Sequence, residues 1–402
     1  MTPAPKQCVI LVGGLGTRLG PLTADCPKPL LPVGGRPFLR YLLWHARRFG
    51  FERALLLAGY RAEVVDDQLS ELRLEGLDVQ VMVEAEPLGT GGALYAARDR
   101  LDETFLLMNG DSLFDFNWLS LGDAFRDDPD SAVAMSLRAV ADASRFGVAE
   151  LDAGRVMAFH ERGDAQGGLI NAGVYQVRRS ALDGFDGKSS FERDVLPALA
   201  AAGRVRGAVK AGFFIDIGVP ASYAEAQSSV PASLRRAALF LDRDGVLNED
   251  DGYVHRADQL RWVAGAVETV RAANERNLFV FVVTNQSGVA RGYYEERDVL
   301  AFHAHMADQL RAHGAHVDDF RYCPHHIDGV KTGYAVTCDW RKPEAGMILD
   351  LAKHWPVDLS ASLMIGDQPT DLAAAAAAGV RSVQYKGGRL DGLFARAMAG
   401  AD

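Results

Sequence analysis

Cysteine, long apolar runs and positive charge are all scarce in this sequence of 402 residues. Its four cysteines, Cys8, Cys26, Cys323 and Cys338, are too few for a disulfide framework and favour a reducing compartment. No stretch reaches the ~20 apolar residues of a membrane-spanning helix, and residues 1–7 hold no apolar signal core. The sequence therefore predicts a cytoplasmic protein without a membrane partner.

Basic side chains number 43 against 53 acidic ones, which gives a formal net charge of −10. This balance argues against a nucleic-acid partner, although a few local cations can still hold a small phosphorylated ligand. Apolar residues at 48% and charged residues at 24% are typical of a globular chain. At about 150 residues per domain, the length suggests two or three domains. The oligomeric state stays open, a homo-oligomer included.

Apolar runs of the β type alternate with helical patterns along the chain, which is typical of parallel α/β sheets. The segment Ser228–Arg236 (SSVPASLRR) interrupts this pattern with serines, a proline and a basic pair. We therefore expect two α/β domains, residues 1–230 and 237–402, with a linker at about 228–236. The predicted strands are Cys8–Val12, Ala54–Ala58, Val79–Val83, Thr104–Met108, Ala237–Leu241, Leu278–Thr284 and Ser362–Ile365.

The first predicted strand runs into Gly13-Gly14-Leu15-Gly16-Thr17-Arg18. Glycines let backbone N–H groups approach a polyphosphate closely. The loop is not a dinucleotide fingerprint, because Leu19 stands where the third glycine belongs, and no Gly-Lys-Ser/Thr makes it a Walker A loop. Arg18 and Lys28 add two cations suited to phosphate oxygens.

Further polar positions follow later strands of the first domain. Leu88–Gly92 forms a second glycine loop, and Asn109-Gly110-Asp111 directly follows the strand Thr104–Met108. Asp216 follows another apolar stretch. In α/β sheets ligands bind at such strand ends, and two acids there can share one Mg²⁺.

These residues, with Glu161 and Asn171, resemble the sugar-1-phosphate nucleotidyltransferases over roughly residues 7–230. The stretches Gly168–Gly173 and Ser190–Glu192 look most like the heptose 1-phosphate guanylyltransferases. The resemblance implies a Rossmann-like domain in which a sugar-phosphate oxygen attacks the α-phosphorus of GTP and pyrophosphate leaves.

The same resemblance implies roles for individual residues. Arg18 would hold the leaving phosphates, Lys28 would stabilise the transition state, and Asp111 and Asp216 would hold Mg²⁺. The implied nucleotide- and sugar-binding residues are Gly13, Gly14, Gly16, Thr17, Leu88, Gly89, Thr90, Gly92, Asn109, Glu161 and Asn171.

The second domain opens with a strand that ends in Asp242-Arg243-Asp244. Two acids at positions i and i+2 can face one site, one as nucleophile in phosphoryl transfer and one as general acid and base. Other candidates follow later strands or supply a cation. They are Thr284, Asn285, Arg341, Lys342 and Asp367.

This order resembles the haloacid-dehalogenase (HAD) phosphatases over roughly residues 237–390. The resemblance implies a HAD-like Rossmannoid domain in which Asp242 is the nucleophile and Asp244 the general acid and base. Thr284, Asn285, Arg341 and Lys342 would bind phosphate, and Asp242, Asp244 and Asp367 would hold Mg²⁺. About 40 residues separate Asp244 from Thr284, too few for a large cap domain.

Gly252–His255 and Thr284–Gly292 look closest to the heptose bisphosphate phosphatases, whose relatives hold structural zinc with Cys-x-His and Cys-x-Cys. Cys323, His325 and Cys338 match three of those ligands, but Trp340 stands in the fourth position. Either His326 or water completes a zinc site, or the loop packs without zinc, which we favour.

Together the resemblances imply a bifunctional enzyme with heptose phosphates and GTP as substrates. It would remove the 7-phosphate of a heptose 1,7-bisphosphate through an aspartyl phosphate and then form GDP-heptose from the resulting heptose 1-phosphate. Two alternatives stay open. The chain could act on another sugar or nucleotide, or the first domain could be a non-catalytic nucleotide sensor that regulates the phosphatase. A sensor has no need of paired metal-binding acids, and histidinol phosphatase activity would leave the transferase domain without a metabolic reason.

Overall fold

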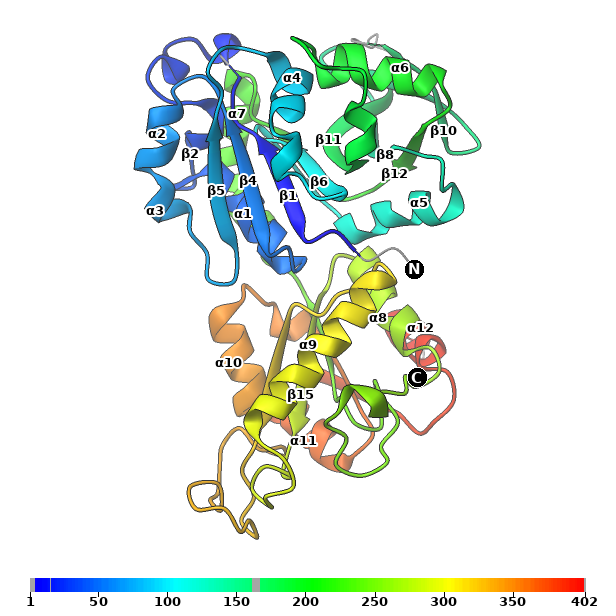
Figure 1. Ribbon diagram of the computed structural model, residues 1–402. Helices are drawn as coiled ribbons and strands as arrows, with labels where there is room; N and C mark the ends of the chain where they lie inside the picture. The colour runs from blue at the N-terminus through cyan, green and yellow to red at the C-terminus, as the bar shows by residue number, and fades with distance from the viewer. Residues whose placement is uncertain (1–3, 15, 161–166, 401–402) are drawn as a thin grey trace. The chain divides into compact units, whose positions relative to one another are not determined.

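The computed structural model describes residues 4–14, 16–160 and 167–400, which form two compact units. One unit comprises Ala4–Ser233, and the other begins at Leu234 (Figure 1). The division falls within the segment predicted as a linker, but helix α7 (Pro220–Ser233) covers most of that segment. Its serines and its proline suggest irregular chain, whereas burial of Ala226 and Val230 holds the segment helical.

The N-terminal unit contains a nine-stranded sheet of order β5-β4-β1-β6-β11-β8-β12-β10-β9. Its first four strands are parallel neighbours and confirm the predicted α/β pattern (Figure 1). Beyond β6 the sheet is mixed, since β11 runs antiparallel to both β6 and β8. The strands are β1 (Gln7–Leu11), β4 (Arg53–Ala58), β5 (Asp78–Val83), β6 (Thr104–Asn109), β8 (Val133–Val140), β9 (Val148–Asp152), β10 (Arg155–His160), β11 (Gly168–Arg178) and β12 (Val205–Val209).

Two small sheets and several helices complete this unit. The antiparallel pair β7 (Ser112–Asp115) and β13 (Phe213–Asp216) sets Asp216 opposite Ser112. A second short pair is β2 (Pro32–Val33) and β3 (Arg36–Pro37). Besides α7, the α-helices are α1 (Phe38–Arg48), α2 (Ala62–Asp67), α3 (Leu69–Leu72), α4 (Gly89–Ala96), α5 (Asp123–Asp127) and α6 (Leu196–Ala201).

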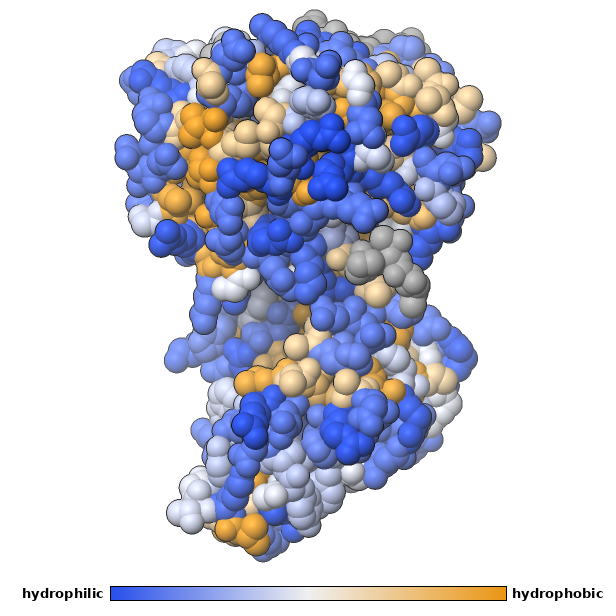
Figure 2. Space-filling model, viewed as in Figure 1, coloured by the Kyte–Doolittle hydropathy of each residue, from blue (hydrophilic) through white to orange (hydrophobic). Residues whose placement is uncertain are grey.

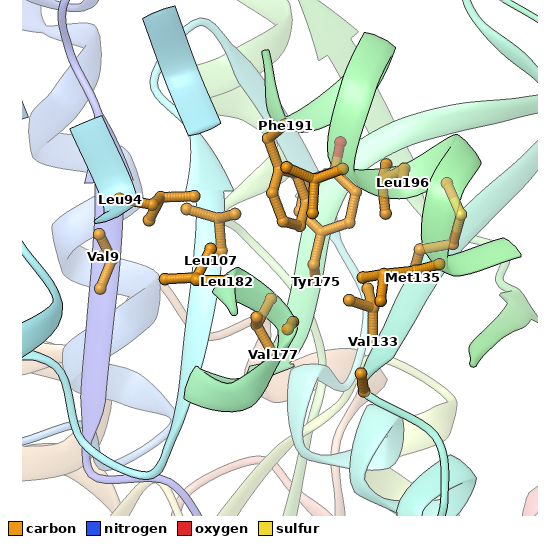
Figure 3. Close-up of a cluster of buried hydrophobic side chains, with 14 of the residues drawn as sticks. Val9, Leu94, Leu107, Val133, Met135, Tyr175, Val177, Leu182, Phe191 and Leu196 are labelled. Atoms are coloured by element: carbon orange, nitrogen blue, oxygen red, sulfur yellow. The ribbon is translucent and has the colours of Figure 1, made fainter. Parts of the chain in front are cut away.

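One apolar cluster joins the parallel and mixed halves of the large sheet. Val9, Leu107 and Tyr175 come from three neighbouring strands, and Leu94 of α4 and Leu196 of α6 belong to the same cluster (Figure 3). All five residues are buried. Burying one such side chain stabilises the fold by roughly 1.5–3 kcal/mol, so the cluster fixes the strand ends that carry the polar residues.

The C-terminal unit has a five-stranded sheet of order β16-β15-β14-β17-β18, and every neighbouring pair is parallel. The segment between β14 and β15 holds only a short 3-10 turn and helix α8, in agreement with a fold that lacks a large cap. The strands are β14 (Ala238–Leu241), β15 (Phe279–Asn285), β16 (Asp319–Cys323), β17 (Leu363–Gly366) and β18 (Arg381–Gln384).

Helices cover both faces of this sheet. Val280 and Val282 of β15 share a buried cluster with Phe302 of α9. The alternate residue Phe281 faces the other side and contacts Trp355, which directly follows α10. The α-helices are α8 (Ala266–Glu275), α9 (Glu296–Ala312), α10 (Gly346–His354), α11 (Pro369–Ala377) and α12 (Leu390–Met398).

No helix in the described ranges is long and apolar enough to cross a membrane. The face of each unit seen in Figure 2 is largely hydrophilic, with apolar residues in separate patches.

Candidate active sites

The C-terminal site lies at the carboxyl edge of the parallel sheet. Asp242 follows β14, Thr284 lies near the end of β15, and Asp367 follows β17. Because these strands are parallel neighbours, their carboxyl ends meet at one edge. A cavity of about 390 Å³ opens there, and its lining includes these three residues with Asp244 and Lys342.

A buried lysine forms the centre of this site. Lys342 Nζ lies 2.8 Å from Asp242 Oδ1 and 2.6 Å from Asp371 Oδ1, and it donates to the Val283 carbonyl at 2.9 Å. Burial alone would lower the pKa of Lys342, but the two carboxylates outweigh it and raise that pKa. Burial raises the pKa of Asp242, and Lys342 opposes that shift. Lys342 thus keeps a positive charge in a nearly water-free position.

Asp244 is held by donors from three side chains. Arg243 donates to both of its oxygens at 3.1 and 2.8 Å, while Asn248 and Gln286 donate at 2.9 and 2.8 Å. Arg243 itself is fully buried. These contacts fix the direction of the Asp244 carboxyl group, which suits an acid that must meet a departing oxygen.

The predicted phosphate-binding residues divide into two groups. Thr284 and Lys342 line the cavity with Asn285. The side chain of Asn285, however, accepts from Lys342 N and donates to Lys342 O, both at 3.1 Å, so it clamps the main chain of the lysine. Arg341 lies away from this cavity and donates to the His325 carbonyl at 3.1 Å. Arg341 and Lys342 lie in a bend that runs into a turn, and the two side chains contact different parts of the unit.

Asp371 is a site residue that the predicted set lacks. It is fully buried, caps α11 by accepting from Gln368 N at 3.0 Å, and pairs with Lys342. Asp371 lies four residues after Asp367, a spacing that favours a shared site. An acid in the first turn of a helix is, however, also typical of a helix cap. Asp242, Asp367 and Asp371 each offer an oxygen within 4.8 Å of the others.

This carboxylate cluster fits a divalent cation. Asp367 Oδ1 is buried without a hydrogen-bond partner among the described residues, and burial raises the pKa of Asp367. Carboxylate oxygens are the ligands that Mg²⁺ prefers. The Asp244 carboxylate already accepts four hydrogen bonds from three side chains, so we expect its main-chain carbonyl rather than its carboxylate to serve a metal.

The three predicted zinc ligands do come together. Atoms of Cys323, His325 and Cys338 lie within 4.8 Å of one another, and burial raises the pKa of Cys323 to about 12. Trp340 contributes only its main-chain N–H, 3.4 Å from Cys338 Sγ. His326 contacts Arg291 through one ring nitrogen and Asp328 N through the other. A closed structural site needs four ligands, so this three-donor set does not fit one.

The N-terminal site pairs a lysine with two acids from distant parts of the chain. Lys28 Nζ lies 2.6 Å from Asp111 Oδ2, and Asp111 directly follows β6. The pairing of β7 with β13 brings Asp216 beside it, and Ser112 Oγ donates to both acids at 3.3 and 3.2 Å. Burial and the neighbouring Asp111 raise the pKa of Asp216. Two carboxylates at the edge of a cavity fit Mg²⁺ in the same way as the C-terminal cluster.

Cations flank these acids. Arg18 and Arg145 line a cavity of about 440 Å³ together with Asp111 and Asp216. Arg145 Nη2 lies 3.7 Å from Asp216 Oδ1. Arg18 belongs to the predicted site, whereas Arg145 does not, because a lone arginine in a loop carries no signal of its own.

Two positions of the first glycine loop require glycine because of the backbone and its neighbours. Gly16 has φ +60°, which favours glycine, and a Cβ on Gly13 would lie 3.2 Å from Gly59 N. Gly14 lines a second cavity of about 190 Å³ with Lys28. Thr17 directly follows Gly16 and begins a 3-10 helix.

Some residues of the second glycine loop line the cavities, and others pack against a neighbouring segment. Thr90 lines both N-terminal cavities. Gly91 and Gly92 instead donate through their main chain to the Ser189 carbonyl at 2.9 and 3.2 Å. Leu88 precedes α4, and its main-chain N–H lies 3.4 Å from Glu84 Oε2, while Gly89 begins the helix. The loop therefore anchors the segment around Ser189 as well as facing the cavities.

A polar network closes the far side of the site. Asn109, Asn171 and Tyr175 all donate to Glu192 Oε1, at 3.1, 3.2 and 3.2 Å. Burial raises the pKa of Glu192. The two asparagines are predicted site residues; Glu161 lies outside the described residues. Glu192 belongs to the stretch Ser190–Glu192, which resembles the guanylyltransferases. Its role in the network is not visible in the sequence, because its partners lie on β6 and β11.

Two family models match the chain. One, described as nucleotidyl transferase, matches residues 7–233, and the other, described as HAD-hydrolase-like, matches residues 339–396.

Individual relatives match each unit separately. The C-terminal part is 50% identical over 157 residues to the D-glycero-beta-D-manno-heptose-1,7-bisphosphate 7-phosphatase of Rhodopseudomonas palustris, covering 39% of this chain and 87% of that protein. The N-terminal part is 33% identical over 230 residues to the D-glycero-alpha-D-manno-heptose 1-phosphate guanylyltransferase of Aneurinibacillus thermoaerophilus, covering 56% of this chain and 98% of the relative. The solved structure of HddC from Yersinia pseudotuberculosis shares 32% identity with a TM-score of 0.51, over 56% of this chain and 99% of its own. A second structure of that protein is a complex with GMP-PN.

Proposed function

The chain belongs to the nucleotidyl transferase family through its N-terminal unit and to the HAD-like phosphatases through its C-terminal unit, and we propose that it catalyses two consecutive steps on one heptose. The C-terminal site removes the 7-phosphate of D-glycero-D-manno-heptose 1,7-bisphosphate. The N-terminal site then joins the resulting heptose 1-phosphate to GMP from GTP and releases pyrophosphate.

One observation carries this proposal: both sites occur on the same chain. The relative of the C-terminal unit is named for a heptose bisphosphate, and the relative of the N-terminal unit for a heptose 1-phosphate. Loss of the 7-phosphate from a heptose 1,7-bisphosphate gives the heptose 1-phosphate of the same anomer. A chain that carries both sites therefore fits a single two-step route.

The names of the two relatives differ in the anomer, beta for the phosphatase and alpha for the guanylyltransferase. The phosphatase breaks a bond at C7, at the opposite end of the sugar from the anomeric carbon. The transferase reacts through the phosphate on C1 itself. We assign the alpha anomer to this chain, because the transferase step is the one that depends directly on it.

In the phosphatase step, the Asp242 carboxylate attacks phosphorus and the sugar oxygen leaves. Asp244, held by Arg243, Asn248 and Gln286, gives that oxygen its proton and then takes a proton from the water that hydrolyses the aspartyl phosphate. Lys342 and the Thr284 hydroxyl bind the phosphate oxygens. Mg²⁺, held by Asp242 with Asp367 and Asp371, would offset the charge of the phosphate and the carboxylates.

In the transferase step, an oxygen of the sugar 1-phosphate attacks the α-phosphorus of GTP in line. Lys28 neutralises charge that develops on the α-phosphate, and Arg18 holds the departing pyrophosphate with the first glycine loop. Asp111 and Asp216 would hold Mg²⁺, which screens the repulsion between the two phosphates.

The test uses the full chain with GTP and Mg²⁺ and supplies each anomer of the bisphosphate separately. We expect phosphate and GDP-heptose from the alpha anomer, and phosphate without GDP-heptose from the beta anomer. If neither anomer yields phosphate or GDP-heptose, the proposal is wrong. If phosphate appears and GTP binds without release of pyrophosphate, the N-terminal unit is a sensor rather than a transferase.

A further inference from the structure

Glu192 occupies an unusual position in the N-terminal site. It lies in a π-helical turn, Phe191–Val195, and lines both N-terminal cavities. Isolated π-turns of this kind are found frequently at functional sites. Nothing in the proposed transfer of GMP uses this carboxylate, although it faces the space between the acids and the two asparagines.

The turn that carries Glu192 is held firmly. Phe191 N donates to Thr90 Oγ1 at 2.8 Å, and the Phe191 ring packs edge-on against Tyr175 with centroids 5.3 Å apart. Ser190 Oγ caps the turn by accepting from Arg193 N at 3.2 Å. The carboxylate therefore projects from a rigid support, which a specificity contact requires.

The two oxygens of Glu192 have different surroundings. Oε1 accepts from Asn109, Asn171 and Tyr175. Oε2 receives no hydrogen bond from any residue in the described ranges, and the side chain is only partly buried. A carboxylate oxygen at a cavity wall that is not already bonded is suited to accept from a ligand hydroxyl.

We propose that Glu192 determines sugar specificity in the transferase site. Its Oε1 positions the amides of Asn109 and Asn171, and its Oε2 accepts a hydrogen bond from one hydroxyl of the sugar 1-phosphate. A sugar that lacks that hydroxyl leaves a half-buried carboxylate oxygen without a donor and binds less well. This inference rests on the proposed function of the N-terminal unit.

The experiment compares Glu192→Gln with the full-length wild-type chain on a panel of single-deoxy sugar 1-phosphates. For the wild type we expect one deoxy analogue to lose about 10- to 100-fold in kcat/KM. For Glu192→Gln we expect a similar loss on the complete sugar, as a higher KM for the sugar phosphate, and little further loss on that analogue. The KM for GTP should stay within about twofold, because Glu192 contacts no predicted phosphate-binding residue.

Glu71→Gln is the matched control, since Glu71 is exposed on α3 and undergoes the same chemical change. An unchanged circular dichroism spectrum shows that each variant folds, and retained phosphatase activity shows that its C-terminal unit is intact. If Glu192→Gln loses activity equally on every sugar, or raises both KM values together, Glu192 only supports the fold and the inference is wrong. If the wild type makes no nucleotide sugar from any member of the panel, the proposed transferase function fails instead.

Discussion

The two sites share one electrostatic arrangement but differ in how they build it. Each sets a lysine against a carboxylate at the end of a parallel strand, Lys28 on Asp111 and Lys342 on Asp242. Lys342 has a second acid, Asp371, and its side chain is only 3% exposed. Lys28 has one acid partner, and its side chain is 9% exposed beside the cavity.

This difference matches the two proposed reactions. The C-terminal unit needs a nucleophilic carboxylate, so its lysine must balance buried acids throughout the cycle. The N-terminal unit needs no protein nucleophile, because the sugar phosphate itself attacks. Its lysine can therefore leave the carboxylate and contact the substrate. In the proposed reactions Lys342 would stay paired with its acids while it contacts phosphate, whereas Lys28 would exchange Asp111 for the substrate.

The most severe test of the comparison removes the nucleophile. Asp242→Asn keeps the shape of the side chain but removes its negative charge, and we expect phosphate release to fall by roughly 10³-fold or more. GDP-heptose formation from supplied heptose 1-phosphate should stay unchanged. Separate assays of phosphate and pyrophosphate measure both effects, and parallel loss of the two activities would contradict independent sites.

The reciprocal change weakens the acid pair of the other unit. Asp216→Asn should lower nucleotidyl transfer by roughly 10²- to 10³-fold, because electrostatic stabilisation of the transferred phosphoryl group is lost. Phosphatase activity should not change. Ser112→Ala is a graded companion, since it removes only the hydroxyl that bridges the two acids, and we expect a loss of tenfold or less.

Replacing each lysine separates its structural from its catalytic role. Lys342→Met leaves Asp242 and Asp371 facing each other without a cation, and we expect it to destabilise the C-terminal unit by about 3–5 kcal/mol. Lys28→Met should destabilise the N-terminal unit by less than this, because its partner Asp111 has a side chain that is 26% exposed to water, while still impairing transfer. Urea denaturation followed by circular dichroism measures the free energy of unfolding of both variants. Equal destabilisation would contradict the different structural roles of Lys28 and Lys342.

The smallest expected effect concerns a buried histidine of the C-terminal unit. Burial, followed by the nearby Arg243, lowers the pKa of His303 to about 3, and its ring stacks on Phe320 at 4.6 Å. In the unfolded chain the same group titrates near 6.5, so protonation below that pH favours unfolding. Between pH 7 and pH 5.5 we expect a loss of about 1 kcal/mol in the free energy of unfolding.

His303→Phe keeps the stacked ring but removes the titrating group. The difference in pH dependence between the variant and the wild type therefore gives the contribution of His303 apart from that of the carboxylates. An identical slope in the two proteins would show that His303 binds protons equally in the folded and unfolded chain, and so that its pKa is not lowered by folding. Arg243 Nη1 lies 3.3 Å from His303 Nε2 and can only donate, so the ring nitrogen accepts and the imidazole is neutral.

Strand ends explain why the C-terminal site was largely predictable. Asp242, Thr284 and Asp367 each stand at the end of a continuous apolar run, and parallel neighbours bring such ends together. Arg341 is predicted beside Lys342 but does not line the cavity, because adjacency in sequence does not give side-chain direction. Asp371 was missed as a site residue because a helix cap accounts equally well for an acid at its position.

The N-terminal unit was less predictable beyond β6. Strand β12, for example, is only partly buried and is interrupted by Arg206 and Gly207, so it lacks the continuous apolar run that marks β1 and β4. Without the strands beyond β6, the sequence does not reveal that Glu192 meets Asn109 and Tyr175, since each of these contacts depends on tertiary packing. The family likeness includes the stretch Ser190–Glu192 but gives no partner for the Glu192 carboxylate.

The pairing of β7 with β13 has a consequence for biosynthesis. Asp111 and Asp216 belong to one acid pair, yet Asp216 lies on the last strand of its unit. During translation β1 and β6 are synthesised long before β13, so the pairing of β7 with β13 cannot form until late. The proposed transfer of GMP uses both acids, so we expect a translation product that ends before β13 to transfer GMP far more slowly than the complete unit.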